Sequence, residues 1–260
     1  MKKIFALSLV LIAFVAIAQN KMGVIYDENV QVRKVPNFTS IRVSNAIELY
    51  ISQSNKTDVA VSAKSEAYRN KIITEVEGGT LIIRMEDNYK WWKWNSEDYK
   101  AKVYVSVKEL YALNGAGATN IKIINGLNAE KFKINLSGAS DLKGEIKART
   151  LLTDLSGASS LKATIHANAL SVKGTGASSF DVIGAGDDLI VDVSGASTVK
   201  MYDYIVKGAS VEASGASSVK VHVEDMLKVN ATGASSIDYK GAASIKEMHS
   251  SGASSVKHKN

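Results

Sequence analysis

The chain has 260 residues, no cysteine, and a formal charge of +6 at pH 7. Without cysteine it has neither disulfides nor a lipid-carrying thiol, so its stability has to come from core burial. Lysines are mixed with Asp and Glu along the whole chain, whereas nucleic-acid binders concentrate positive charge on one face or arm. We therefore expect no nucleic-acid partner.

Residues 1–18 have the pattern of a secretory signal peptide. Lys2 and Lys3 precede an apolar run at residues 4–15, and Ala16-Ile17-Ala18 is a small-x-small cleavage site. A membrane anchor needs about 20 apolar residues, and this run stops before Gln19. We predict export to the periplasm, the outer surface or the medium, with no transmembrane span in residues 19–260.

Residues 37–113 predict a run of uneven strands. Apolar and polar residues alternate through most of residues 38–51, which is typical of half-buried strands. Further strands are expected at residues 59–63, 80–84 and 101–107, with a leading strand at 29–35 and a short helical turn within 65–74. We expect these elements to form the irregular first rungs of a single domain.

Three tryptophans interrupt this part of the chain at Trp91, Trp92 and Trp94. Tryptophan buries a large area and is enriched at binding hot spots, and its flat ring suits sugars. The segment could instead fold over one side of the core and seal it. We predict Trp91, Trp92 and Trp94 as ligand-binding residues, and alternation along the segment allows both functions together.

Residues 114–260 repeat one short phrase. It begins with Ser or Thr, continues Gly-Ala-Ser, and recurs seven times, with glycines at 138, 157, 176, 195, 215, 233 and 252. The spacing is 19, 19, 19, 20, 18 and 19 residues. A fixed period of this length marks a solenoid, in which each repeat buries its apolar face only against its neighbours.

Each repeat predicts two inward-facing strands joined by the Gly-Ala-Ser turn. Positions two, four and six before the glycine are small or branched apolar residues, as in Phe132, Ile134 and Leu136. The connections are too short for helical crossovers, so the rungs have to stack in parallel. The predicted fold is all-β: a right-handed parallel β-helix with rungs of about 19 residues.

The repeated phrase itself predicts a structural corner. Glycine allows a positive φ and close stacking of turns, and the hydroxyls can bond the turn's own backbone or form ladders. The alternative is a flat hydroxyl array that binds ice or a polymer. The phrase's last position forms a column in which Asp at every third rung neutralises lysine, and we interpret it as a solvated ladder: Lys143, Lys162, Asp181, Lys200, Lys220, Asp238 and Lys257.

We find no pattern of catalytic or metal-binding residues. His166 and His222 share a column but lie three rungs apart, roughly 14 Å at the usual strand spacing, which is too far for one zinc ion. Asp154 and Asp192 share another column, with Lys173 between them. Asp187-Asp188 follows a Gly184-Ala-Gly186 segment that predicts a turn, where the pair would cap a loop or bind a cation weakly. We expect no cofactor.

The sequence resembles the head GIN domain family, a bacterial family of auto-transporter adhesin heads. The resemblance rests on residues 38–43 and 47–53, on the glycine turn before Leu81-Ile-Ile83, and on the Gly-Ala-Ser series. It covers nearly all of residues 19–260 but not the tryptophan segment. It implies an exported β-helical protein with a function in adhesion, and it carries no catalytic residues to this chain.

We therefore expect a non-enzymatic β-solenoid that binds a surface glycan or an envelope protein. Two alternatives stay open: a glycan-active hydrolase or lyase with a carboxylate pair in the N-terminal region, and a purely structural envelope protein. The last rung departs from the pattern because Lys246 and Ser250 stand where apolar residues are expected. Either terminal lysines protect this exposed edge, or a partner chain covers it, which would make a homo-oligomer through the solenoid ends.

Overall fold

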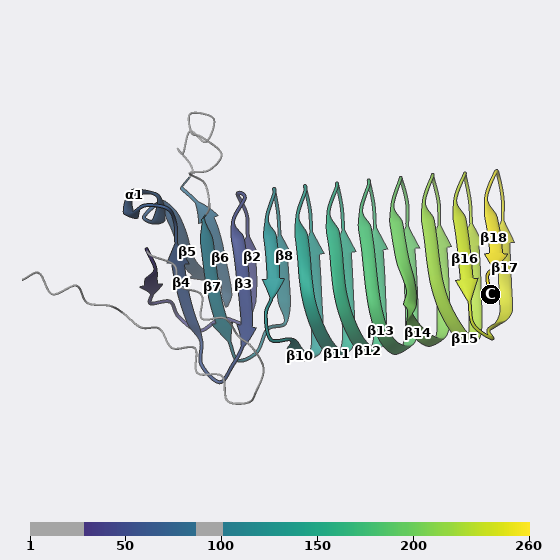
Figure 1. Cartoon of the computed structure of the whole chain (residues 1–260), viewed down its shortest axis with the longest axis horizontal. Helices are drawn as coiled ribbons and strands as arrows, with labels where there is room; N and C mark the ends of the chain where they lie inside the picture. The colour runs from purple at the N-terminus through teal and green to yellow at the C-terminus, as the bar shows by residue number, and fades with distance from the viewer. Residues whose placement is uncertain (1–28, 87–100) are drawn as a thin grey trace, which may run out of the picture.

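A computed structural model describes residues 29–86 and 101–260. The predicted signal peptide, residues 1–18, and the predicted ligand-binding residues Trp91, Trp92 and Trp94 lie outside the described residues. The described part is a β-solenoid of about eight turns with rungs of about 19 residues, as predicted (Figure 1). Among the described residues, no helix has the length and apolar character required to cross a membrane.

The regular rungs are built from long strands that pair in parallel with their neighbours. Each of β11 to β15 has 14 to 16 residues and bends midway, so one bent strand, and not two separate ones, runs from corner to corner. These strands are β10 (Leu127–Leu136), β11 (Asp141–Leu155), β12 (Ser160–Gly174), β13 (Ser179–Val193), β14 (Thr198–Ala213) and β15 (Ser218–Ala231).

The Gly-Ala-Ser phrase forms the sharp corner between consecutive strands, as expected. The Ala158 N–H donates to the Gly138 carbonyl at 2.7 Å, and the same bond recurs at every later corner. Ser159 Oγ donates to the Ser156 carbonyl at 2.9 Å. The phrase's final serine is buried in the regular rungs, with Ser159 only 1% exposed. Those serines therefore serve the corner and cannot form a binding array.

The strand register confirms the predicted columns. Lys162 pairs with Asp181, and Asp181 pairs with Lys200 on the next rung. The Lys162 Nζ and Asp181 Oδ2 atoms are 3.2 Å apart. His166 and His222 share a column with two rungs between them. Asp154, Lys173 and Asp192 occupy consecutive rungs of another column.

The N-terminal end is built out of chain order. The rung formed by β2 and β3 lies between β6 and β7 on one side and β8 and β9 on the other. The chain thus first forms the rung of β2 and β3, then forms β6 and β7 on the N-terminal side of it. It then returns to form β8 and β9 on the opposite side, where the regular rungs begin. The strands are β2 (Ser40–Val43), β3 (Glu48–Gln53), β6 (Thr80–Met85), β7 (Lys102–Val107), β8 (Ala112–Gly115) and β9 (Asn120–Ile123).

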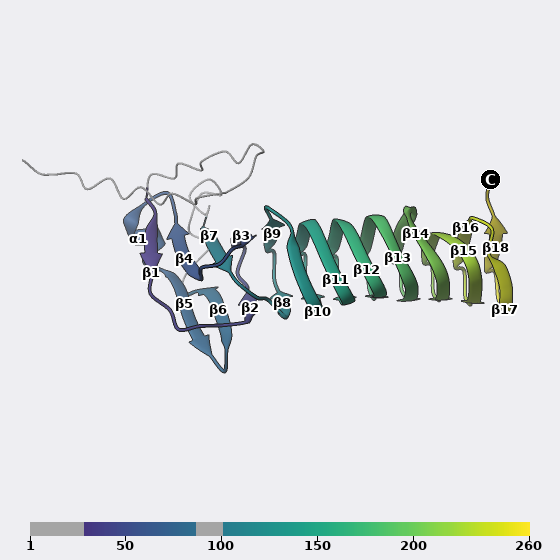
Figure 2. The same ribbon diagram turned by 90° about the horizontal axis from the view of Figure 1, so that it is seen from below.

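Antiparallel strands close that end of the rod. β4 (Asp58–Ser62) pairs antiparallel with β7 and with β1 (Gln31–Arg33). β5 (Ile72–Glu77) forms an antiparallel hairpin with β6, which projects from the side of the rod in Figure 2. Helix α1 (Glu66–Arg69) lies at the same end (Figure 1).

The last complete rung consists of β16 (Ser236–Lys240) and β17 (Ser244–Ser250), and β18 (Ser255–His258) stacks on β16. Here the expectation that Lys246 would occupy a core position is wrong. A β-bulge at Lys246 shifts the register, so that Ile245 continues the core column of Leu227 and Met248 continues that of Val229. An extra residue in an edge strand can in this way remove a charge from a core column.

Candidate binding groove

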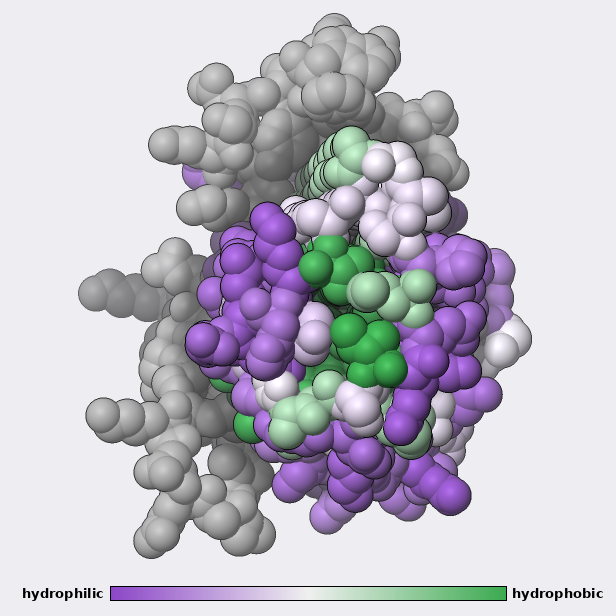
Figure 3. Space-filling view, turned by 90° about the vertical axis from the view of Figure 1, so that its right-hand side faces the viewer, coloured by the Kyte–Doolittle hydropathy of each residue, from purple (hydrophilic) through white to green (hydrophobic). Residues whose placement is uncertain are grey.

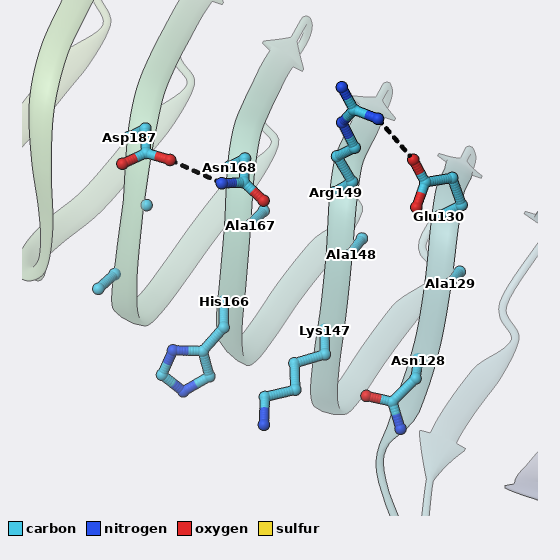
Figure 4. A pocket seen from close by; sticks show the side chains of 12 residues that line it. Asn128, Ala129, Glu130, Lys147, Ala148, Arg149, His166, Ala167, Asn168 and Asp187 are labelled. Carbon is cyan, nitrogen blue, oxygen red and sulfur yellow. Dashed lines mark hydrogen bonds and ion pairs between the residues drawn. The ribbon is translucent and has the colours of Figure 1, made fainter.

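A groove of about 870 Å³ runs along the rod, about halfway round each rung from the Gly-Ala-Ser corner. Three residues from each of β10, β11, β12 and β13 line it, namely those ten, nine and eight positions before the next corner glycine. These are residues 128–130, 147–149, 166–168 and 185–187. Parallel register therefore places the same three positions side by side on four rungs, with different polar side chains on each rung (Figure 4).

Small residues form the middle row of the groove. Ala129, Ala148, Ala167 and Gly186 are paired in register on consecutive strands. Ala167 is only 4% exposed, so its methyl group packs toward the core. Because no large side chain rises from this row, the polar side chains on either side form the walls.

One wall is tied together by its own polar contacts. Arg149 Nη1 lies 3.0 Å from Glu130 Oε1. Asn168 Nδ2 donates to Asp187 Oδ2 at 2.7 Å, and Lys207 Nζ lies 2.7 Å from Asp187 Oδ1. The hydrogen bond from Lys207, then that from Asn168, lowers the pKa of Asp187, and the same contact with Asp187 raises the pKa of Lys207. This wall holds its charges in pairs.

The other wall offers free polar groups. Asn128, Lys147 and His166 lie in one column, close to the bend of their strands (Figure 4). Among the described residues, none accepts or donates a side-chain hydrogen bond to these three side chains, and none forms an ion pair with them. A ligand in the groove would meet an amide, an ammonium group and an imidazole on successive rungs.

The segment Gly184-Ala-Gly186 is not the turn that was predicted. It lies inside β13, where a Cβ on Gly186 would lie 2.4 Å from Tyr204 Oη. Glycine is needed there because the fully buried Tyr204 ring of β14 fills that space. Asp187 consequently pairs with Lys207 and caps no loop. In the described residues, no cluster of three His, Cys, Asp or Glu side chains could hold a metal ion.

A smaller cavity of about 350 Å³ adjoins the groove at Asn128. Gln53 crosses it: its Nε2 donates to the carbonyls of Lys108 at 3.0 Å and Asn128 at 2.9 Å. Its Oε1 accepts from the Asn128 N–H at 2.7 Å. With every polar atom of the Gln53 side chain engaged, this cavity is a structural junction between the irregular and the regular rungs.

The sequence pattern did not predict the groove, although it contains a signal for it. An Ala or Gly stands nine residues before each of the corner glycines 138, 157, 176 and 195. The apolar positions two, four and six before each glycine predicted the strands but not this row of small residues. The predicted tryptophan site cannot be placed relative to the groove, because residues 87–100 lie outside the described part of the chain.

Solved structures share this architecture. A protein from Parabacteroides distasonis described as a "Putative lipid binding protein" is 25% identical with a TM-score of 0.80, and the match covers 90% of this chain and 98% of that one. A "putative adhesin" from Parabacteroides merdae is 15% identical with a TM-score of 0.80, covering 89% and 96%. Another "putative adhesin" from P. distasonis is 19% identical with a TM-score of 0.81, covering 89% and 96%.

No curated protein matches the chain. The sequence profile of one family, described as "Putative auto-transporter adhesin, head GIN domain", matches residues 37–243. That range includes the irregular rungs, the whole groove and nearly all of the corners. The chain therefore belongs to this head GIN domain family.

Proposed function

We propose that this chain is an exported, non-enzymatic binding protein of the cell envelope, and that its groove holds an extended surface glycan. The observation that carries the proposal is a groove along the rod in which a row of small residues is flanked by polar side chains on four successive rungs. Membership of a family described as adhesin heads and the likeness to proteins described as adhesins support surface binding.

The repeat suits a polymer better than a compact ligand. Rungs of a parallel solenoid are spaced by about 4.8 Å, so the groove extends roughly 14 Å from its first to its fourth rung. A chain molecule lying parallel to the rod would meet at least one polar side chain at each step. Hydroxyl-rich sugars match the amide, ammonium, imidazole and guanidinium groups of the walls.

The arrangement of carboxylates favours binding over hydrolysis. Glu130 and Asp187 are the only carboxylates that line the groove within the described residues, and they lie three rungs apart. Glycoside hydrolases place their two carboxylates about 5–9.5 Å apart, whereas three rungs correspond to roughly 14 Å. Both carboxylates are also occupied by neighbouring cations. A hydrolase or lyase remains the alternative, with a purely structural envelope protein as the third.

Trp91, Trp92 and Trp94 stay part of the proposal as a second contact. Their rings would add stacking area for sugar rings, since the described residues that line the groove include no Phe, Tyr or Trp. The 25% identical protein from P. distasonis is described as lipid-binding. Envelope lipids are therefore included in the test below.

The test is a binding screen of the purified protein against glycans, envelope proteins and envelope lipids. The triple variant Asn128→Ala, Lys147→Ala, His166→Ala should lose glycan binding, whereas Lys200→Ala, an exposed lysine on another face, should bind as the wild type does. Unchanged binding by the triple variant would overturn the groove assignment. Trp91→Ala, Trp92→Ala and Trp94→Ala test the second contact, and hydrolysis products in the same screen would establish an enzyme.

A further inference from the structure

The C-terminal end of the rod exposes core residues. Ile245 is 37% exposed and Met248 is 56% exposed, although both continue core columns of the rungs behind them. Figure 3, which views the rod from this end, shows an apolar region surrounded by polar side chains. In the described structure, β17 and β18 pair with β15 and β16 on one side only, so their outer backbone groups are open.

The other end of the rod does not offer a matching surface. Its outermost strands, β1 and β5, belong to antiparallel pairs. A second copy that placed its N-terminal end on β17 and β18 would therefore meet them with strands from antiparallel pairs, and not with another rung of the parallel stack. Two copies can instead join through their C-terminal ends. Such a contact has two-fold symmetry and uses the same surface of both copies, so no further copy can add to it.

We propose that two copies of this chain associate through their C-terminal ends, corner on corner, with β17 of each copy antiparallel to β18 of the other. A two-fold axis through the stacked corners places Gly252 opposite Gly252 of the second copy. Each residue then lies opposite the residue at the same distance on the other side of the corner glycine. Centring the axis on Gly252 sets this register, and the inward-facing columns on either side of the corner test it.

The register brings apolar residues together. Met248 lies four positions before Gly252 and Val256 lies four positions after it, so each Met248 faces Val256 of the second copy. Both belong to inward-facing columns, since Met248 pairs with Val229 and Val256 pairs with Ile237. Opposed residues in an antiparallel pair point to the same side of the sheet. A register shifted by one residue would have placed a core residue opposite an outward one.

The same register also pairs opposite charges. Glu247 and Lys257 lie five positions before and after Gly252, and both point outward, as their partners Lys228 and Asp238 on the preceding rungs do. Each Glu247 therefore faces Lys257 of the second copy, and symmetry makes this pair twice. The bulge at Lys246 lies just beyond the residues that would pair between the two copies. It interrupts the regular strand there, so the hydrogen bonds between copies are limited to the residues nearest the corner.

The proposal does not depend on the ligand of the groove. Its consequence is a rod of twice the length that carries two grooves, and two linked sites bind a surface polymer with higher avidity than one. The two-fold contact closes on itself, because the N-terminal ends stay free of it. A dimer is therefore expected, and no longer filament.

Sedimentation over a range of protein concentrations measures the association. The wild type should dimerise, and Met248→Asp, which places a charge at the centre of an exposed patch, should raise the dissociation constant by roughly tenfold or more. Glu247→Lys and Lys257→Glu should each weaken the dimer, whereas the double variant should restore it. Such rescue identifies the register. Any effect of the two substitutions within one copy is still present in the double variant, so the recovered dimer stability has to come from the contact between residues 247 and 257 of different copies.

Cysteine cross-linking gives an independent readout in a chain that has no cysteine of its own. Glu247→Cys with Lys257→Cys should form a covalent dimer under mild oxidation, since opposed Cα atoms at about 4.5–5.5 Å suit a disulfide. Ser210→Cys with Lys200→Cys, in the same two columns but inside the rod, should not. A monomer at all concentrations, or a dimer that none of the end variants weakens, would overturn the proposal.

Discussion

Gly157 stacks directly on Gly138: a Cβ added to Gly157 would lie 2.6 Å from the Gly138 carbonyl oxygen. That oxygen accepts the N–H of Ala158, so it cannot move away without losing a bond between rungs. The φ of Gly157 is +71°, which L side chains also disfavour. Two independent constraints thus require glycine at the corner.

Gly157→Ala should therefore destabilise the protein by about 2–4 kcal/mol, since it adds a backbone clash to the cost of a positive φ. Gly79→Ala is the matched control, because Gly79 has a φ of +74° with nothing within 4 Å of its Cβ position. The control should cost only about 1–2 kcal/mol. Urea unfolding measures both, and equal losses would show that stacking at the corner adds nothing.

Reversing one charge of the outward ladder should weaken the stack by a small, salt-dependent amount. Asp181→Lys would give six lysines on consecutive rungs, from Lys122 to Lys220. Exposed pairs are worth about 0.2–1 kcal/mol each, so a loss of roughly 1 kcal/mol is expected at low salt. Asp181→Asn should cost less. If the loss were the same in about 1 M salt, where screening is nearly complete, repulsion would not be its cause.

Removing Lys207 should raise the pKa of Asp187 toward its ordinary value. Lys207 is the main cause of the lowered pKa, and Asn168 is the second. Carboxyl titration by NMR should thus give a larger rise for Lys207→Met than for Asn168→Ala. Because the folded pKa is the lower one, this group favours folding above the ordinary carboxyl range, and its contribution is lost as the pH falls through the folded pKa. An unchanged pKa in Lys207→Met would exclude the contact in solution.

Tyr204→Phe should leave the free energy of unfolding unchanged or raise it by up to about 1 kcal/mol. The Tyr204 hydroxyl is buried, and it forms no hydrogen bond with any group of the described residues. Burial, and secondarily the charge of Asp187, raises the pKa of Tyr204 far above its ordinary value of 10.0. A clear loss of stability at neutral pH would mean that the hydroxyl has a bound partner.

The same substitution has an alkaline signature. Above about pH 10 the unfolded tyrosine ionises while the buried one stays protonated, so the wild type should lose stability as the pH rises. Tyr204→Phe has no phenol to ionise. The difference in stability between the two proteins should therefore grow above about pH 10 in favour of the variant, and parallel pH profiles would contradict a buried neutral phenol.

Much of the architecture could be predicted because a solenoid depends on local repetition. The spacing of Gly138, Gly157 and Gly176 set the rung length, and with it the columns of Lys162 with Asp181 and of His166 with His222. Parallel stacking followed from connections too short for a crossover. Even the charge ladder could be predicted, since residues one period apart have to become neighbours.

Departures from the period could not be predicted in this way. The bulge at Lys246 places Ile245 in the core column of Leu227. Gly184-Ala-Gly186 is part of a strand because it pairs with the neighbouring rungs, and glycine at position 186 leaves room for Tyr204. The placement of β2 and β3 between β6–β7 and β8–β9 depends on contacts far apart in sequence. The rung and its corner follow from the amino-acid sequence alone, because both repeat locally. The exposed edge at the C-terminal end could also be predicted from the last repeat, whereas the groove and the closed N-terminal end depend on how rungs meet in space, so they emerge only in the folded chain.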